Sequence, residues 1–142
     1  MARDVMLRKL TFLHKLLSDL APLRGSNMAQ IMAEHYKLER LLELLVMTAS
    51  DLLFHLLAEQ GVNPDSYRAA FRQAGELGLL PMELAGRLQA AAGMRNILVH
   101  QYEDIDYIIL HDSIEPALHD FAQFAALLTT RFDQESADND AG

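Results

Sequence analysis

Apolar residues recur at helical spacing along most of the chain, and this periodicity restricts the possible folds more than any other feature of the sequence. The clearest example is a long segment, residues 28–60. Its apolar positions alternate four and three residues apart, as in the seam between packed helices: Leu38, Leu42, Leu45, Ala49, Leu52 and Leu56. No segment alternates apolar and polar residues as a half-exposed strand does. The sequence therefore predicts an all-α protein.

Proline, glycine and capping residues divide this pattern into five expected helices. Pro22 and Gly25 interrupt the chain after the first helix, and Gly61 ends the second. The tripeptide Asn63-Pro64-Asp65 matches the cap, first-turn proline and early acid of a short third helix. The expected helices cover about residues 4–19, 28–60, 65–74, 81–100 and 106–132. The expected fold is a bundle of four major helices plus one short helix.

The second expected helix carries further apolar residues beside its seam. They widen the apolar stripe to a second side of the helix: Leu41, Leu44, Met47 and Leu53. A helix that is apolar on two sides is expected to serve both the core and a partner chain. The fourth helix also has more apolar positions than one bundle can hide, so we expect a homodimer through these two helices.

The last expected helix contains a proline and is followed by an acidic tail. Pro116 lacks a backbone donor and its ring clashes with the carbonyl of Asp112, so a kink or a restart is expected there. Residues 133–142 contain four acids and no apolar residue larger than alanine. We therefore expect one helical domain over residues 1–132 and a disordered tail over residues 133–142.

The composition narrows the class of protein. The chain has 12 Lys and Arg residues against 20 Asp and Glu residues, and this net charge of −8 speaks against a surface that binds nucleic acid by bulk electrostatics, so any such contact must come from a few placed cations. It has no cysteine, which excludes a disulfide framework and a thiolate zinc site. Its apolar runs are far shorter than the roughly 18 residues of a membrane span. The N-terminal sequence lacks the apolar region of a secretory signal, so a cytoplasmic protein is expected.

The six histidines do not form a recognisable metal motif: His14, His35, His55, His100, His111 and His119. The sequence also contains no glycine-rich phosphate loop and no serine elbow. The remaining candidates for chemistry are Arg95, His100 and Tyr102. Each of the three also has a structural interpretation. Arg95 could pair with Glu103 or Asp104, His100 could cap a helix C-terminus, and Tyr102 could serve packing.

The segment Arg95-Asn96-Ile97-Leu98-Val99-His100-Gln101-Tyr102 resembles the signature of the HEPN superfamily. That signature is an arginine, usually followed by a polar residue, and a histidine a few positions later. A tyrosine two residues after the histidine resembles the HepT branch. The surrounding segments follow in the order typical of the family: RDVMLRKLTFLHKLLSDL, LERLLELLVMTASDLLFHLLAEQG, NPDSYRAAF and LGLLPMELAGRLQAAAGMRNILVHQYEDID. The resemblance covers about residues 3–132, and Pro116 departs from it.

The resemblance implies a homodimeric RNase toxin that cleaves RNA without a metal or cofactor, in a cleft where two protomers meet. It implies Arg95 and His100 as the catalytic pair, supported by Asn96. The residue types suit this reaction, because histidine accepts or donates protons near neutral pH and arginine presents a planar fork to phosphate oxygens.

The resemblance also implies a partner, a minimal nucleotidyltransferase antitoxin of the MntA type that transfers AMP to the tyrosine of the motif. In this chain that tyrosine is Tyr102, which we expect to be accessible at the end of the fourth helix. The alternative function is a non-catalytic helical module that binds a nucleotidyltransferase and presents its substrate. The acidic charge favours this alternative, whereas the complete set of motif residues favours the nuclease.

Helix geometry leaves two points open. Five residues place Arg95 and His100 about 140° apart on an ideal helix, so they share a face only if the helix ends or distorts or if Arg95 reaches round. Asp51 and His55 lie four residues apart and therefore on one face of the second helix. They are either an exposed pair or supporting residues that line the same cleft.

Overall fold

The computed structural model describes the backbone of residues 2–141 and the side chains of residues 3–101 and 103–139. Within these residues every regular element is helical, which confirms the all-α prediction. In chain order the elements are α1 (Ala2–Leu20), η1 (Ala21–Leu23), α2 (Met28–Ala33), α3 (His35–Ala58), α4 (Tyr67–Glu76), α5 (Met82–His100), η2 (Tyr102–Asp104), α6 (Tyr107–Asp112) and α7 (Ile114–Ala141). The η elements are single 3₁₀ turns.

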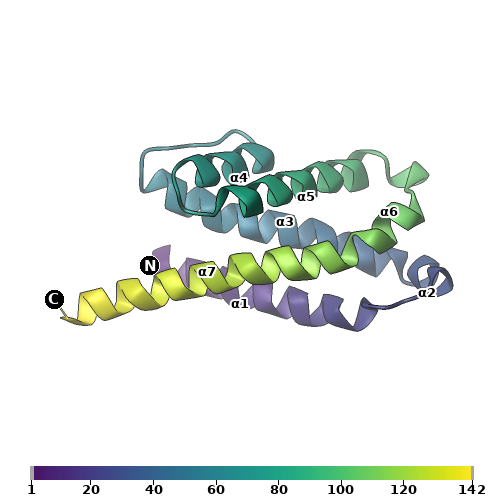
Figure 1. Ribbon diagram of the computed structural model, residues 1–142, viewed down its shortest axis with the longest axis horizontal. Helices are drawn as coiled ribbons and strands as arrows, with labels where there is room; N and C mark the ends of the chain where they lie inside the picture. Colours follow the sequence, from purple (N-terminus) through teal and green to yellow (C-terminus); the bar gives the residue numbers. More distant parts are fainter. Residues whose placement is uncertain (1, 142) are drawn as a thin grey trace.

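The four long helices α1, α3, α5 and α7 form the bundle, and α4 lies against α5 as the predicted short helix (Figure 1). The helix α3 runs through the middle and contacts α1, α4, α5 and α7. The short helices α2 and α6 contact each other at the end of the bundle opposite the two chain termini (Figure 1). The predicted bundle of four major helices plus one short helix is therefore confirmed, with α2 and α6 as additional short helices.

The core follows the predicted seam of α3. Its six seam residues, from Leu38 to Leu56, are all buried. Burying one leucine fully contributes about 1.5–3 kcal/mol, so this seam is a large part of the hydrophobic stabilisation. By length and composition α3 could also cross a membrane, but 61% of its most apolar window is buried in the bundle. Its hydropathy is that of a central core helix.

The second apolar side of α3 is also covered by the bundle. Leu41 and Leu53 are buried, and Leu44 packs against the core. The expectation that this side faces a partner chain is therefore wrong for Leu41, Leu44 and Leu53. It fails because α4 and α5 cover one side of α3 while α1 and α7 cover another. Met47 is half-buried and lies outside the core cluster, so the expectation stays untested there.

The expected helix over residues 28–60 is divided at Glu34, whose φ of −110° and ψ of 16° are not helical. The first piece, α2, begins with a capping box, in which Asn27 accepts a hydrogen bond from the Gln30 amide and Gln30 accepts one from the Asn27 amide. The break lets α2 turn onto α6, where Ile31 is fully buried. A continuous rod would have left that face without a partner.

The helix α4 begins two residues later than expected. Ser66, and not Asn63, is its N-cap, and its hydroxyl accepts a hydrogen bond of 3.0 Å from the amide of Ala69. The serine side chain satisfies an amide that has no partner within the helix. Pro64 consequently lies in the irregular segment before α4 rather than at the first helical position.

The last helix restarts near Pro116, as the sequence predicts. α6 ends at Asp112 and α7 begins at Ile114. Pro116 is the third residue of α7, where a helical amide has no intrahelical acceptor, so the missing donor costs little. The helix then continues to Ala141, which places its end nine residues beyond the expected position 132. Residues 133–139 form no part of the core, because none of their side chains is buried.

Candidate active site

The helix α5 carries the motif on its last two turns and stays regular to its end. The amide of Gln101 donates to the carbonyl of Ile97 over 2.8 Å, and the chain then enters η2. Arg95 and His100 therefore keep the separation of about 140° that an ideal helix requires. No early helix end brings the two side chains to one face within a single protomer.

Arg95 packs against α4 through an aromatic ring. Its guanidinium carbon lies 4.9 Å from the centre of the Tyr67 ring, a cation–π contact. Its Nε is buried and has no hydrogen-bond partner among the described residues. Within the described part of the chain Arg95 forms no ion pair with Glu103 or Asp104. The guanidinium is therefore held by a ring and not by a carboxylate.

Arg95 lies between two hollows, one on each side of α5. The first, here called the α4–α5 pocket, encloses about 470 Å³. Its walls are Phe54, Pro64, Asp65, Ser66, Tyr67, Arg68, Arg95 and Asn96. It thus brings two arginines and an amide, all hydrogen-bond donors, around one space.

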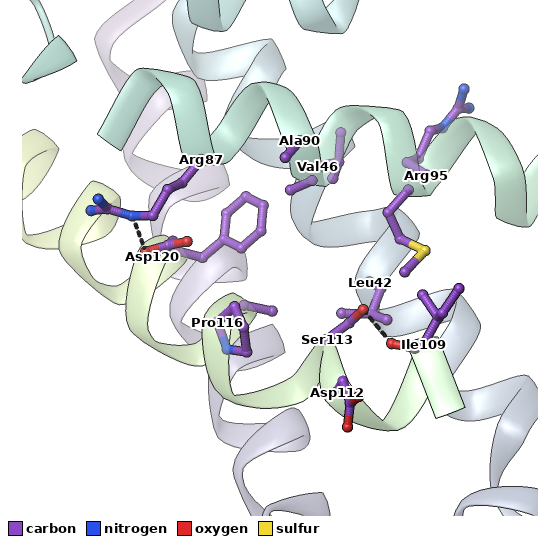
Figure 2. Close-up of a pocket in the computed structure, with 14 residues that line it drawn as sticks. Leu42, Val46, Arg87, Ala90, Arg95, Ile109, Asp112, Ser113, Pro116 and Asp120 are labelled. Carbon is purple, nitrogen blue, oxygen red and sulfur yellow. Dashed lines mark hydrogen bonds and ion pairs between the residues drawn. The ribbon is translucent and has the colours of Figure 1, made fainter. Parts of the chain in front are cut away.

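The second hollow, here called the α5–α7 pocket, encloses about 390 Å³ and is mostly apolar. At one end Arg87 Nε donates to Asp120 Oδ1 over 2.9 Å, and at the other Ser113 donates to the Ile109 carbonyl over 2.7 Å (Figure 2). Figure 2 also shows the Arg95 guanidinium pointing away from this pocket. The Arg95 guanidinium therefore lies on the side of α5 that faces α4.

The structure brings together some of the predicted site residues and not others. Asn96 lines the α4–α5 pocket with Arg95. His100 is exposed on the last turn of α5 and lines neither pocket. A single protomer therefore presents the arginine and the histidine on different parts of its surface.

Asp51 and His55 lie away from both pockets. The Asp51 carboxylate accepts a hydrogen bond from Lys9 Nζ over 3.3 Å, so it faces α1. His55, one turn later, lines neither pocket, and its neighbour Phe54 lines the α4–α5 pocket instead. Neither Asp51 nor His55 therefore forms part of the pocket wall beside Arg95, and the Asp51 carboxylate faces α1 instead.

Tyr102 is the first residue of η2, directly after α5. Its side chain lies outside the described residues, and the expectation that it is accessible therefore remains a prediction. Among the described residues there is no group of three or more His, Asp or Glu side chains arranged to hold a metal ion.

Tyr67 and Arg68 are the site residues that the sequence did not indicate. They open α4, and only the packing of α4 on α5 brings them to Arg95. The contact joins residues 28 positions apart, which helical periodicity does not predict. The only available signal was that the segment NPDSYRAAF fell within the family resemblance.

Comparison with known proteins identifies relatives of this chain. A family model described as ribonuclease HepT-like matches residues 13–128. A tRNA nuclease HepT of Aphanizomenon flos-aquae is 39% identical over 70 residues, which are 48% of this chain and 47% of that protein. An mRNA nuclease HepT of Shewanella oneidensis is 31% identical over 75 residues, 52% of this chain and 56% of that protein. The chain thus matches about half the length of these curated relatives.

A solved structure shares the fold. It is that of a tri-AMPylated HEPN toxin of Shewanella oneidensis in complex with MNT antitoxin. The TM-score is 0.80, the identity is 22%, and the match covers 89% of this chain and 98% of that chain. The predicted HEPN-like fold class is thereby confirmed.

Proposed function

The chain belongs to the HepT-like ribonuclease family, and from that membership we propose that it is a metal-independent endoribonuclease toxin with Arg95 and His100 as its catalytic residues. The proposal rests on the contacts that the Arg95 guanidinium makes within this family's fold. This guanidinium rests on Tyr67 and on no described acid, and although its Nε is buried, the donors of its two terminal nitrogens are available for a phosphate. The two curated relatives named as HepT nucleases support the same activity.

The proposed reaction is transesterification by the RNA's own ribose. The 2′-oxygen attacks the adjacent phosphorus, and the bond from phosphorus to the 5′-oxygen of the next nucleotide breaks. One imidazole takes the proton from the 2′-hydroxyl, another supplies a proton to the departing 5′-oxygen, and Arg95 stabilises the charge on the phosphorane. The products are a 2′,3′-cyclic phosphate and a 5′-hydroxyl.

We propose that two protomers complete the site. The separation of Arg95 from His100 on a regular α5 supports this, since a second copy would supply the missing histidine across the cleft. Apolar side chains are also exposed near the end of α5 and on α6, notably Ile97, Ile108 and Ile109. A dimer interface at this end of the bundle would cover these apolar side chains. We propose this interface in place of the one on α3 that the sequence suggested.

We propose further that a minimal nucleotidyltransferase antitoxin controls the enzyme in the cytoplasm by transferring AMP to Tyr102. Tyr102 follows His100 by two residues, so an attached AMP would place negative charge beside the catalytic groups. That phosphate would compete for the arginine and repel the RNA backbone. The AMPylated toxin and its antitoxin in the solved relative support this assignment.

The test of the nuclease proposal is cleavage of RNA by the purified full chain. Wild type should cut RNA in the presence of EDTA and leave 2′,3′-cyclic phosphate ends. His100→Ala should lower the rate about 10²- to 10⁴-fold without changing the melting temperature, since the side chain is exposed. His14→Ala, an exposed histidine on α1, is the matched control. Activity that EDTA abolishes, or that survives in His100→Ala, would contradict the proposal.

The modification has its own test. With the nucleotidyltransferase, ATP and magnesium, the intact mass should rise by one or more AMP units, all on the peptide that contains Tyr102. Tyr102→Phe should remain unmodified, and Tyr107→Phe should be modified like wild type. If wild type accepts AMP but never cuts RNA, the non-catalytic module that presents a substrate to its partner becomes the better account, and the net charge of −8 favours that alternative.

A further inference from the structure

The α4–α5 pocket contains an arginine that the catalytic proposal does not use. Arg68, the second residue of α4, lines the pocket with Arg95 and Asn96. Its side chain reaches across to α5, since a Cβ at Gly93 would lie 3.8 Å from Arg68 Nη2. Two guanidinium groups from different helices therefore border one hollow of about 470 Å³.

The chain keeps these two arginines close together without an acid to neutralise them. Among the described residues neither Arg68 nor Arg95 forms an ion pair. The one carboxylate in the pocket wall is Asp65, which is exposed. The hollow thus has an excess of positive charge in a chain whose net charge is −8. A local cationic site on an acidic protein is suited to an anion that must be bound at a defined place.

Tyr67 explains how Arg95 is held without being neutralised. A carboxylate would fix the guanidinium but would occupy its hydrogen-bond donors, whereas an aromatic ring contacts the face of the guanidinium and leaves its in-plane donors free. The Tyr67 ring is itself fixed, because it packs against Phe54 of α3 with 6.1 Å between ring centres. The buried, unpartnered Nε shows that Arg95 reaches this position at a cost in hydrogen bonding.

We infer that the α4–α5 pocket binds a backbone phosphate of the RNA, that Arg68 contacts this phosphate together with Arg95, and that Tyr67 is a positioning residue for Arg95. The inference rests on the proposed ribonuclease function and adds a substrate contact to it. RNA is the occupant that the arrangement favours, because the pocket continues from Arg95, the residue that faces the scissile phosphate. The strand would then cross the end of α5 with a neighbouring phosphate held between α4 and α5.

Binding is tested with a fluorescent 2′-O-methyl RNA, which has no free 2′-hydroxyl and cannot be cut by this chemistry. Arg68→Gln should weaken binding about fivefold near 0.1 M salt and reduce the salt dependence by about one phosphate contact. The control is Arg72→Gln, one turn later on α4, where the arginine pairs with Glu76 over 3.7 Å and lies outside the pocket. It should bind within about twofold of wild type.

Positioning is tested with cleavable RNA. Tyr67→Leu should lower kcat about tenfold, whereas Tyr67→Phe keeps the ring and should recover most of the rate. Arg68→Gln should raise KM and leave kcat nearly unchanged, since it removes a contact equal in the ground and transition states. Thermal melts check that each protein is folded. Because Arg68 is exposed, Arg68→Gln should fold and therefore tests the inference even if Tyr67→Leu does not fold.

The outcomes separate this inference from the nuclease proposal. If wild type cuts RNA and Arg68→Gln binds and cuts like wild type, the inference fails and the function stands. A wild type that does not bind the 2′-O-methyl RNA, or a Tyr67→Phe as slow as a folded Tyr67→Leu, also overturns the inference. If the protein binds RNA through Arg68 but cuts no RNA, this result would support the phosphate site in the α4–α5 pocket and refute the nuclease proposal.

Discussion

Two arginines on α5 lie in different surroundings, one beside a buried acid and the other beside an aromatic ring. Arg87 and Arg95 are eight residues apart, about 80° around an ideal helix. Arg87 donates to Asp120 over 2.9 Å and to Gln123 over 3.3 Å, both on α7. Arg95 instead faces α4, where Tyr67 covers its guanidinium and no described acid pairs with it.

The two arginines differ in the groups that their guanidinium groups contact. Asp120 is only 6% exposed, and its Oδ1 accepts from both Arg87 and His119, so Arg87 compensates a buried charge. Among the described residues Arg95 pairs with no acid, and its buried Nε has no partner. A guanidinium that an aromatic ring holds at some cost in hydrogen bonding fits the proposed phosphate-binding role of Arg95.

The largest expected effect is on RNA cleavage, and it distinguishes Arg95 from Arg87. Arg95→Ala should lower RNA cleavage about 10²- to 10⁴-fold with little change in melting temperature, since it removes charge needed in the transition state. Arg87→Ala should keep most of the activity but lower the free energy of unfolding by about 1–2 kcal/mol, because Asp120 loses its main partner. That loss corresponds to roughly 3–6 °C in melting temperature. Equal loss of activity in both folded variants would remove the distinction.

Two glycines test how tightly α4 packs on α5, with an exposed glycine of α5 as the reference. A Cβ at Gly75 of α4 would lie 2.7 Å from the Cβ of Ala85, so Gly75→Ala must push α4 away from α5. Overpacking of about 1–3 kcal/mol should outweigh the gain of about 1 kcal/mol in helix propensity, and the melting temperature should fall. Gly86 of α5 has nothing within 4 Å of its Cβ position, so Gly86→Ala should stabilise by about 0.5–1 kcal/mol. A Gly75→Ala protein more stable than wild type would mean that α4 is loosely packed.

A smaller effect is expected at the acid in the α4–α5 pocket. Asp65 is exposed and repels any phosphate that enters. Asp65→Asn should therefore raise the affinity for 2′-O-methyl RNA by about twofold, and the gain should shrink at high salt. Asp112→Asn, an exposed acid in the wall of the α5–α7 pocket, is the control and should leave affinity unchanged. An equal gain from both substitutions would indicate bulk charge and not a local phosphate site.

The smallest effect is expected at the end of α7, which touches neither arginine. No side chain of residues 133–139 is buried, so deletion of residues 133–142 should change the melting temperature by less than about 2 °C and leave RNA cleavage intact. A larger fall would show that the end of α7 docks onto the protein.

Local sequence signals predicted most of the fold. The seam residues of α3 are buried, α5 covers Met82–His100 within the expected span, and the chain restarts beside Pro116. The sequence missed the break at Glu34, because a break there depends on α2 packing against α6 and not on a helix-breaking residue. It also placed the end of the last helix too early, since α7 continues to Ala141 although none of the described side chains after Phe132 is buried.

The candidate site was predicted less completely than the fold. The motif placed Arg95, Asn96 and His100 correctly on the end of one helix. The spacing of Asp51 and His55 correctly put them on one face of α3, but that face turns toward Lys9 on α1. A local pattern specifies which residues share a face, whereas the direction of the face depends on how the helices pack.

The sequence by itself determined that α5 is a helix and that both of its arginines lie on it, because periodicity and helix ends depend on neighbouring residues. Only the tertiary structure decided that Arg87 meets a buried carboxylate and Arg95 meets an aromatic ring. Their partners come from α7 and α4, which contact different parts of α5 through long-range packing. The physical reason is that an arginine's charge is the same in every sequence, while its availability depends on the groups that the fold brings beside it.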